Sequence, residues 1–393
     1  MILLLFAAVA WAQDEAETHR FKEPAHNRKC GMLVPPKLRK KETVPLLLAL
    51  PDTAGLGSLE LDRWRHEAML NRWAVLSLDI MTSRKRGWHP KEQLEMQEDM
   101  EATLAALEEA MKRAPIDKTA IILRGHSGGT YLTLWLGLRR PDLFLGICGD
   151  GVVFFKEAIP VDDKYEKVKP DLDLPILLYR GELDNTRARK GTEQARDQLK
   201  KAGYKNVTYK TVPKLGHLPD VKTFVTWAKE LLKSTKKQRQ AVRKLLIEAD
   251  KIRAQLAKGT SRSVYSKLAK LVQQEAKAGV SAGGAELVAE VSKRALTLMQ
   301  QAKTMEAGGR MVEAAEVYAD VDNTYFPLPV GKAARAEKKR LKQTDAFKAD
   351  EILRKALRYF NRGDKDKAFT LFEKIMQQYP DTPAAKIANE TMK

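Results

Sequence analysis

The pentapeptide Gly125-His-Ser-Gly-Gly129 is the feature that most constrains how this chain can fold. It directly follows the apolar run Thr119–Arg124 and directly precedes the helical pattern Thr130–Leu138. Gly-x-Ser-x-Gly between a strand and a helix is the pattern of a nucleophile elbow, because small residues beside the serine allow a sharp turn. We therefore predict that Ser127 lies at the end of a strand, with its hydroxyl presented as a nucleophile.

A serine nucleophile needs a histidine base, and the histidine needs an acid to orient it. Only one histidine, His217, follows Ser127 in the chain, and it lies in a loop after a strand-like run. Asp184 follows the strand-like run before that and is our first choice for the acid. Glu182 and Asp150 are the alternatives, since each also lies just after a strand-like run. The chain order of serine, acid and histidine is the one that such elbows use.

Apolar strands alternate with amphipathic helices over the first 233 residues. This alternation predicts an α/β fold, a mostly parallel sheet with helices on both faces. Active groups in such sheets gather at the carboxyl ends of the strands. We expect strands near 44–50, 73–79, 119–124, 144–150, 174–180 and 206–212, and helices near 58–70, 90–113, 127–140, 189–203 and 219–233.

On these motifs, residues 43–233 resemble an α/β-hydrolase of the esterase, feruloyl-esterase and dienelactone-hydrolase-like kind. The resemblance implies Ser127 as nucleophile, Asp184 as acid and His217 as base. It also implies hydrolysis of a carboxylic ester through an acyl-enzyme, a reaction that needs no metal or organic cofactor. The expected substrate is a small-molecule or polymer-linked ester.

One departure from the family concerns the oxyanion hole. The family usually carries His-Gly after its first core strand, where this chain has Pro51-Asp52. The resemblance implies that the backbone amides of Thr53 and Gly128 bind the oxyanion. A carboxylate at Asp52 disfavours a developing oxyanion unless it points away. A catalytically inactive scaffold is therefore one alternative, with helical repeats that bind a partner protein or an envelope polymer. A serine peptidase is another.

The chain changes character after residue 233, where strand-like runs stop and long helical patterns follow. We interpret 234–295 as a helical linker region and 296–393 as tetratricopeptide-like repeats, because 302–334 aligns with 356–388 at an offset of 54 residues without a gap. The alignment also predicts an all-α helical-repeat domain after the α/β domain. It pairs Ala302 with Ala356, Gly309 with Gly363, Ala314 with Ala368, Tyr325 with Tyr379, Pro329 with Pro383, Lys332 with Lys386 and Ala334 with Ala388.

The net charge of +19 belongs almost entirely to the second half of the chain. Residues 201–393 contain 39 Lys and Arg against 21 Asp and Glu, whereas residues 1–200 are nearly neutral. Such an excess attracts anionic partners, but no recognisable nucleic-acid motif accompanies it. We interpret it as Lys-rich helix surface and expect no specific nucleic-acid binding.

Two terminal features and two loops complete the predictions. Residues 1–12 are apolar and end in Ala-x-Ala, which predicts a signal peptide and export to the periplasm or outside the cell. Residues 13–42 are predicted to be an extended entry segment. The basic loop 81–90 contains Trp88 and His89 as candidate substrate contacts, with a solvated surface loop as the alternative. The segment 152–170 is a candidate cap over the site.

Export would allow a disulfide between the two cysteines, Cys30 and Cys148. Cys148 lies in a strand-like run, so we predict a buried thiol instead. Two isolated cysteines give no metal-site spacing.

Overall fold

The computed structural model describes residues 16–80, 93–152, 158, 170–259, 261–278 and 280–393. The chain divides into two units, Met1–Gln240 and Ala241–Lys393. We call them unit 1 and unit 2 and describe each by itself.

Unit 1 is built on an eight-stranded sheet in the order β1-β2-β4-β3-β5-β6-β7-β8. The pairs β1–β2 and β2–β4 are antiparallel, and every other neighbouring pair is parallel. The predicted mostly parallel sheet is therefore confirmed. The strands are β1 (Glu17–Lys22), β2 (Lys29–Val34), β3 (Val44–Leu50), β4 (Ala74–Leu78), β5 (Ile116–His126), β6 (Gly146–Asp150), β7 (Ile176–Gly181) and β8 (Val207–Val212).

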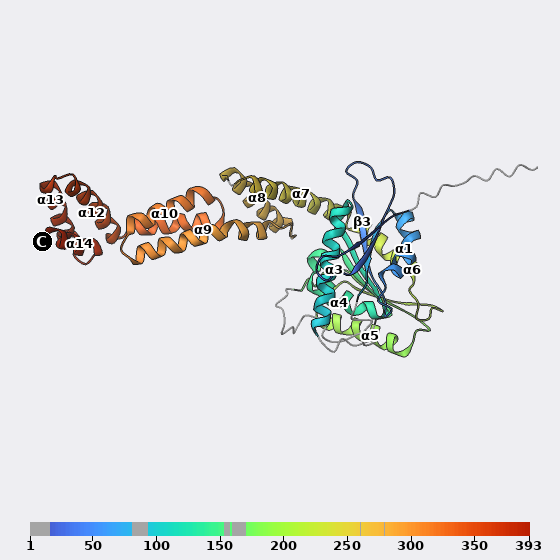
Figure 1. Ribbon diagram of the computed structural model, residues 1–393. Coiled ribbons are helices and arrows are strands. Elements are labelled where there is room, and N and C mark those ends of the chain that lie inside the picture. Colours follow the sequence, from blue (N-terminus) through green and yellow to red (C-terminus); the bar gives the residue numbers. More distant parts are fainter. Residues whose placement is uncertain (1–15, 81–92, 153–157, 159–169, 260, 279) are drawn as a thin grey trace, which may run out of the picture. The chain divides into compact units, whose positions relative to one another are not determined.

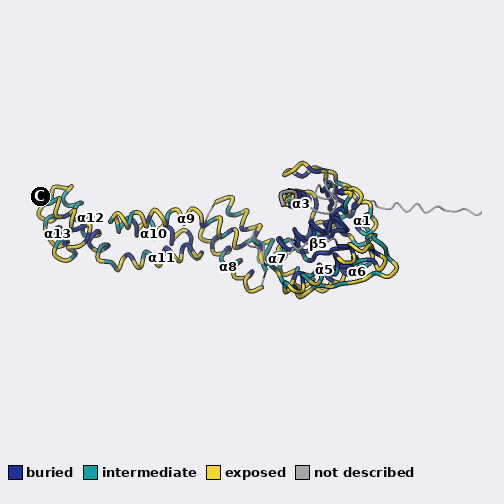
Figure 2. The backbone as a smooth tube through the Cα atoms, turned by 90° about the horizontal axis from the view of Figure 1, so that it is seen from below, coloured by how far each residue is buried: buried dark blue, intermediate teal, exposed yellow. Residues whose placement is uncertain are grey.

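Helices cover both faces of this sheet (Figure 1). One face packs on α1 (Gly57–Asn71) and α6 (Val221–Ser234), and its core includes Trp64 and Phe224. The other packs on α3 (Gln93–Arg113), α4 (Thr130–Arg139) and α5 (Thr186–Lys201). The strands β2 to β7 are buried almost throughout, whereas the edge strands β1 and β8 and the outer helix faces are partly exposed (Figure 2). A sheet buried on both faces explains why its central strands read as continuous apolar runs.

The entry segment differs from its prediction. Residues 13–42 contain β1 and β2, an antiparallel pair that extends the main sheet along β4. In β1 polar side chains alternate with partly buried ones, because the strand lies at the sheet edge. Five of the six residues of β2 are buried, but Gly31 interrupts its apolar run and Pro35-Pro36 follows it directly. Neither strand gives the long apolar signal that marks the central strands.

The two cysteines are both buried free thiols. Cys30 packs in the core beneath α3 and α4, and Cys148 packs in the core beneath α1 and α6. Because they lie on opposite faces of the sheet, they do not form a disulfide. Burial raises the pKa of Cys30 to about 12 and also raises the pKa of Cys148. Both thiols are therefore protonated near neutral pH and act as small apolar side chains.

The described residues of unit 2 form helices only. A first apolar core holds residues from Ala249 to Phe347, and a second holds residues from Ala349 to Ala388. The helices are α7 (Lys236–Lys258, which begins in unit 1), α8 (Arg262–Ala278), α9 (Gly284–Ala307), α10 (Met311–Tyr325), α11 (Pro329–Lys342), α12 (Asp345–Asn361), α13 (Lys365–Gln378) and α14 (Pro383–Met392).

The 54-residue offset found in the sequence has a structural counterpart in unit 2. Gly309 and Gly363 both have a positive φ, of 78° and 85°, in the turns before α10 and α13. Pro329 and Pro383 begin α11 and α14. The paired alanines of the alignment are all fully buried where the helices approach one another. Helices α9, α10 and α11 thus correspond in position to α12, α13 and α14. Kinship with tetratricopeptide repeats stays a prediction.

Candidate active site

Ser127 lies at the sharp turn between β5 and α4. Strand β5 ends at His126, a short 3₁₀ turn covers Ser127–Gly129, and α4 begins at Thr130. The backbone of Ser127 has φ of 49°, in the left-handed region that non-glycine residues rarely adopt. A strained backbone at a chemically competent residue is a recurring feature of functional sites.

The glycines of the pentapeptide are required by close backbone approach. A Cβ at Gly125 would lie 2.5 Å from the carbonyl oxygen of Gly129, and a Cβ at Gly129 would lie 2.4 Å from the carbonyl oxygen of Pro51. Neither distance is tolerated by a real side chain. The two glycines therefore let β5 turn directly into α4, with Ser127 at the turn.

The structure brings Ser127, His217 and Asp184 together in one hydrogen-bonded chain. The distance between Ser127 Oγ and His217 Nε2 is 2.8 Å, and that between His217 Nδ1 and Asp184 Oδ1 is 2.6 Å. Ser127 and Asp184 are buried, whereas the His217 side chain is 27% exposed. The hydrogen bond to Asp184 raises the pKa of His217, with burial opposing and the charges of Asp150 and Asp52 adding to the rise.

The loops that carry the acid and the histidine are tied to each other. The backbone N–H of Leu183 donates to the carbonyl of Leu215, at 2.8 Å. Glu182, the first alternative for the acid, is exposed, and its carboxylate accepts the backbone N–H of Lys214 at 2.9 Å. Glu182 therefore braces the histidine loop, whereas Asp184 is the carboxylate that contacts His217.

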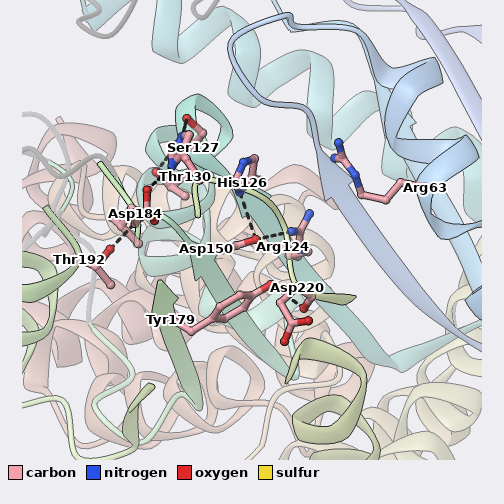
Figure 3. Close-up of polar contacts among 12 residues, drawn as sticks. Arg63, Arg124, His126, Ser127, Thr130, Asp150, Tyr179, Asp184, Thr192 and Asp220 are labelled. Atoms are coloured by element: carbon pink, nitrogen blue, oxygen red, sulfur yellow. Dashed lines mark hydrogen bonds and ion pairs between the residues drawn. The ribbon is translucent and has the colours of Figure 1, made fainter. Parts of the chain in front are cut away.

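Asp150, the second alternative for the acid, is engaged elsewhere. Its Oδ2 lies 2.7 Å from a guanidinium nitrogen of Arg124 and 3.1 Å from Nδ1 of His126 (Figure 3). The contact with His126 lacks hydrogen-bond alignment. Asp150 is 1% exposed and the side chain of Arg124 is fully buried. Asp150 thus belongs to a buried ion pair beneath the site.

The two expected oxyanion-hole residues are neighbours. A Cβ at Gly128 would lie 3.1 Å from the backbone nitrogen of Thr53, so the two backbone segments approach each other next to the nucleophile. The carboxylate of Asp52 accepts the backbone N–H of Ala54 at 2.9 Å, inside its own turn. This bond holds one carboxylate oxygen of Asp52 in the turn.

Several sequence predictions lie outside the described residues. They concern residues 1–12 of the signal peptide, the loop with Trp88 and His89, and nearly all of the segment 152–170. Over the described ranges, no group of His, Cys, Asp and Glu side chains has the arrangement of a metal site, and no helix is long and apolar enough to cross a membrane. A hollow of about 430 Å³ lies beside Thr43 and Pro115, and the triad residues do not line it.

No protein-family model matches the sequence, and no curated protein matches it either. Among solved structures, a thermostable esterase covers 51% of this chain at 18% identity and a TM-score of 0.38, and the chain spans 55% of that protein. A ferulic acid esterase from Anaeromyces mucronatus aligns with 52% of this chain, and the alignment spans 84% of the esterase, at 12% identity and a TM-score of 0.40. An acylaminoacyl peptidase from Pyrococcus horikoshii aligns with 56% of this chain, and the alignment spans 41% of the peptidase, at 16% identity and a TM-score of 0.41. These likenesses do not identify a reaction, which has to be inferred from the site itself.

Proposed function

We propose that the chain is a serine hydrolase that cleaves a carboxylic ester through an acyl-enzyme. The observation that carries the proposal is the unbroken chain from Ser127 Oγ through His217 to Asp184, at 2.8 and 2.6 Å, with the serine on a strained strand-to-helix turn. Nucleophile, base and orienting acid within hydrogen-bond reach of one another are the geometry that activates a serine hydroxyl.

The geometry suggests how each group acts. Ser127 Oγ attacks the ester carbonyl carbon while His217 Nε2 accepts the hydroxyl proton. The imidazolium then donates that proton to the leaving alcohol, and its Nδ1–H remains hydrogen bonded to Asp184. The backbone amides of Gly128 and Thr53 are proposed to donate to the oxyanion. A water molecule, deprotonated by His217, hydrolyses the acyl-enzyme and restores the free serine. No step requires a metal or an organic cofactor.

The substrate, the partner and the location are further proposals. A small-molecule or polymer-linked ester fits the chemistry of the triad. The helical repeats of unit 2 are proposed to bind a protein partner, since paired helices with regular spacing offer extended surfaces. Export to the periplasm or beyond rests on the apolar residues 1–12 alone.

Steady-state hydrolysis of a panel of p-nitrophenyl and aryl esters tests the proposal. The full chain is expected to hydrolyse at least one ester, and Ser127→Ala and His217→Ala are expected to lower kcat by at least about 10³-fold. Asp197→Asn is the matched control, because it removes an exposed carboxylate of unit 1 that pairs with Arg196 and contacts neither the triad nor its loops. Hydrolysis of aminoacyl amides but not of esters would favour the peptidase. A folded chain that hydrolyses neither would favour the inactive scaffold.

A further inference from the structure

A row of polar side chains crosses the sheet directly beneath the triad. His126 on β5 is the register partner of Asp150 on β6, and Asp150 is the register partner of Tyr179 on β7. Register partners in a parallel sheet project from the same face. Tyr179 packs in the core beneath α1 and α6, so the row lies on the face that these helices cover. All three residues are at most 4% exposed.

The carboxylate of this row, on Asp150, forms an ion pair with one arginine. Arg124, two residues before His126 on β5, is fully buried. Its guanidinium lies 2.7 Å from Asp150 and 3.3 Å from Glu60 of α1. Glu60 is itself 1% exposed. Buried ions are costly unless they are paired and hydrogen bonded. We call Glu60, Arg124, His126, Asp150 and Tyr179 the buried polar layer (Figure 3 shows four of them).

The buried polar layer reaches the histidine loop at two points. The hydroxyl of Tyr179 donates to the backbone carbonyl of Asp220 at 3.0 Å. Asp220 is three residues beyond His217 and caps the N-terminus of α6 by accepting the N–H of Thr223. Burial raises the pKa of Tyr179 well above its usual value, so the hydroxyl keeps its proton and can donate.

The second contact is between two imidazole rings, those of His126 and His217. The imidazoles of His126 and His217 have centroids 5.0 Å apart and planes tilted by 37°. Nδ1 of His126 lies 3.1 Å from the carboxylate of Asp150, which pairs with Arg124. One side of the His217 ring therefore contacts a buried ring that lies beside the Arg124–Asp150 ion pair.

We propose that the buried polar layer positions the catalytic imidazole, with Tyr179 and His126 as the two residues that hold the histidine loop and the His217 ring. The inference rests on the proposed hydrolase function. It assigns Tyr179, His126 and Asp150 as positioning residues, which touch neither the scissile bond nor the nucleophile's oxygen. A base on a loop needs such support, because proton transfer requires Nε2 to stay within hydrogen-bond reach of Oγ.

Tyr179→Phe tests the proposal by removing one hydroxyl and adding no charge. The matched control is Tyr204→Phe, since Tyr204 is also buried in unit 1 and its hydroxyl has no hydrogen-bond partner among the described residues. The rate constant for reaction with a fluorophosphonate is expected to fall about 10- to 100-fold in Tyr179→Phe, with KM for an ester substrate unchanged. The proposal is overturned if the two variants react within twofold of each other.

A readout that needs no turnover separates this proposal from the proposed function. The Nδ1 proton of His217, in its 2.6 Å bond to Asp184, is expected to give a low-field proton NMR signal. Loss of that signal in Tyr179→Phe and its retention in Tyr204→Phe would support positioning, even if the wild type hydrolyses no ester. Retention of a sharp signal in both variants would contradict it.

Asp150→Asn adds a test through pH. The charged groups that face His217 are Asp184 from the β7 loop, Asp150 from β6 and Asp52 from the β3 loop, and all three favour its protonated form. The His217 pKa, followed by NMR, is therefore expected to fall in Asp150→Asn. An unchanged pKa would contradict an action of the Asp150 carboxylate on the His217 ring. If Asp150→Asn does not fold, Tyr179→Phe decides the question.

Discussion

Replacing Gly151 by alanine should displace His217, the proposed base, although it substitutes no residue of the proposed triad. Gly151 follows β6 and has φ of 57°. A Cβ built there lies 3.1 Å from Cε1 of His217 and 3.4 Å from Oδ2 of Asp184. Carbon atoms pack best at about 3.5–4.0 Å, so the imidazole must retreat by about 0.4–0.9 Å. Because the Ser127–His217 contact is only 2.8 Å, such a shift acts directly on the proton-transfer distance.

Displacement on this scale predicts a loss of activity. A misplacement of 1 Å can lower a rate about 100-fold, so Gly151→Ala should lower kcat for an ester by about 10-fold. The left-handed backbone adds a stability penalty of about 1–2 kcal/mol for any residue with a Cβ. Urea denaturation measures the second effect, and steady-state hydrolysis measures the first.

Gly203→Ala is the matched control for the backbone penalty. Gly203 also has a positive φ, 93°, but a Cβ there meets only Leu172, at 3.6 Å. It should lose similar stability and keep its activity. If Gly151→Ala loses no more activity than Gly203→Ala, then His217 is not held where the structure places it, and the reasoning fails.

The other predictions concern charge and helix turns. The hydrogen bond to Asp184 raises the pKa of His217 above its usual 6.5, so kcat/KM should fall as pH drops through that raised pKa, and Asp52→Asn should move the midpoint lower in a pH–rate profile. Arg124→Met leaves the buried carboxylate of Asp150 without its ion-pair partner, whereas Glu60 keeps Arg63, and should cost about 3–5 kcal/mol of stability in urea denaturation; a smaller loss than in a surface arginine variant would contradict the buried pairing. In unit 2, Gly309→Ala should lower Tm more than Gly363→Ala, because only the first Cβ meets α14, at 2.9 Å; equal losses would show that this contact is relaxed.

The sequence predicted that Ser127, Asp184 and His217 lie together because all three obey one simple rule. Ser127, Asp184 and His217 each follow a strand, and parallel strands bring their carboxyl ends to one edge of the sheet. Gly125 and Gly129 mark this turn in the sequence, because a side chain at either position would collide with the backbone. Order along the chain and turn chemistry were therefore enough to place three side chains that lie up to 90 residues apart.

The buried polar layer was not predicted, and its chemistry explains why. Arg124 directly follows the apolar run Ala120–Leu123 inside β5, which signals a buried charge with a partner. Its partner Glu60 lies 64 residues away on a helix, and no periodicity or spacing indicates that pairing. Side-chain contacts between elements depend on how helices pack on the sheet, which the pattern of apolar residues does not specify. The edge strand β1 and its neighbour β2 were missed because a polar strand, and a short apolar run that contains a glycine and stands among charged residues, resemble extended loops in sequence.

The most direct test of the central claim is to locate the site of covalent reaction with a fluorophosphonate. The folded full chain would be incubated with the probe, digested and examined by peptide mass spectrometry, beside Ser127→Ala and His217→Ala. The proposed mechanism predicts one adduct, on Ser127, that is absent from Ser127→Ala and forms much more slowly in His217→Ala. An unmodified Ser127 in a folded chain, or an adduct that forms as quickly without His217, would contradict an activated serine.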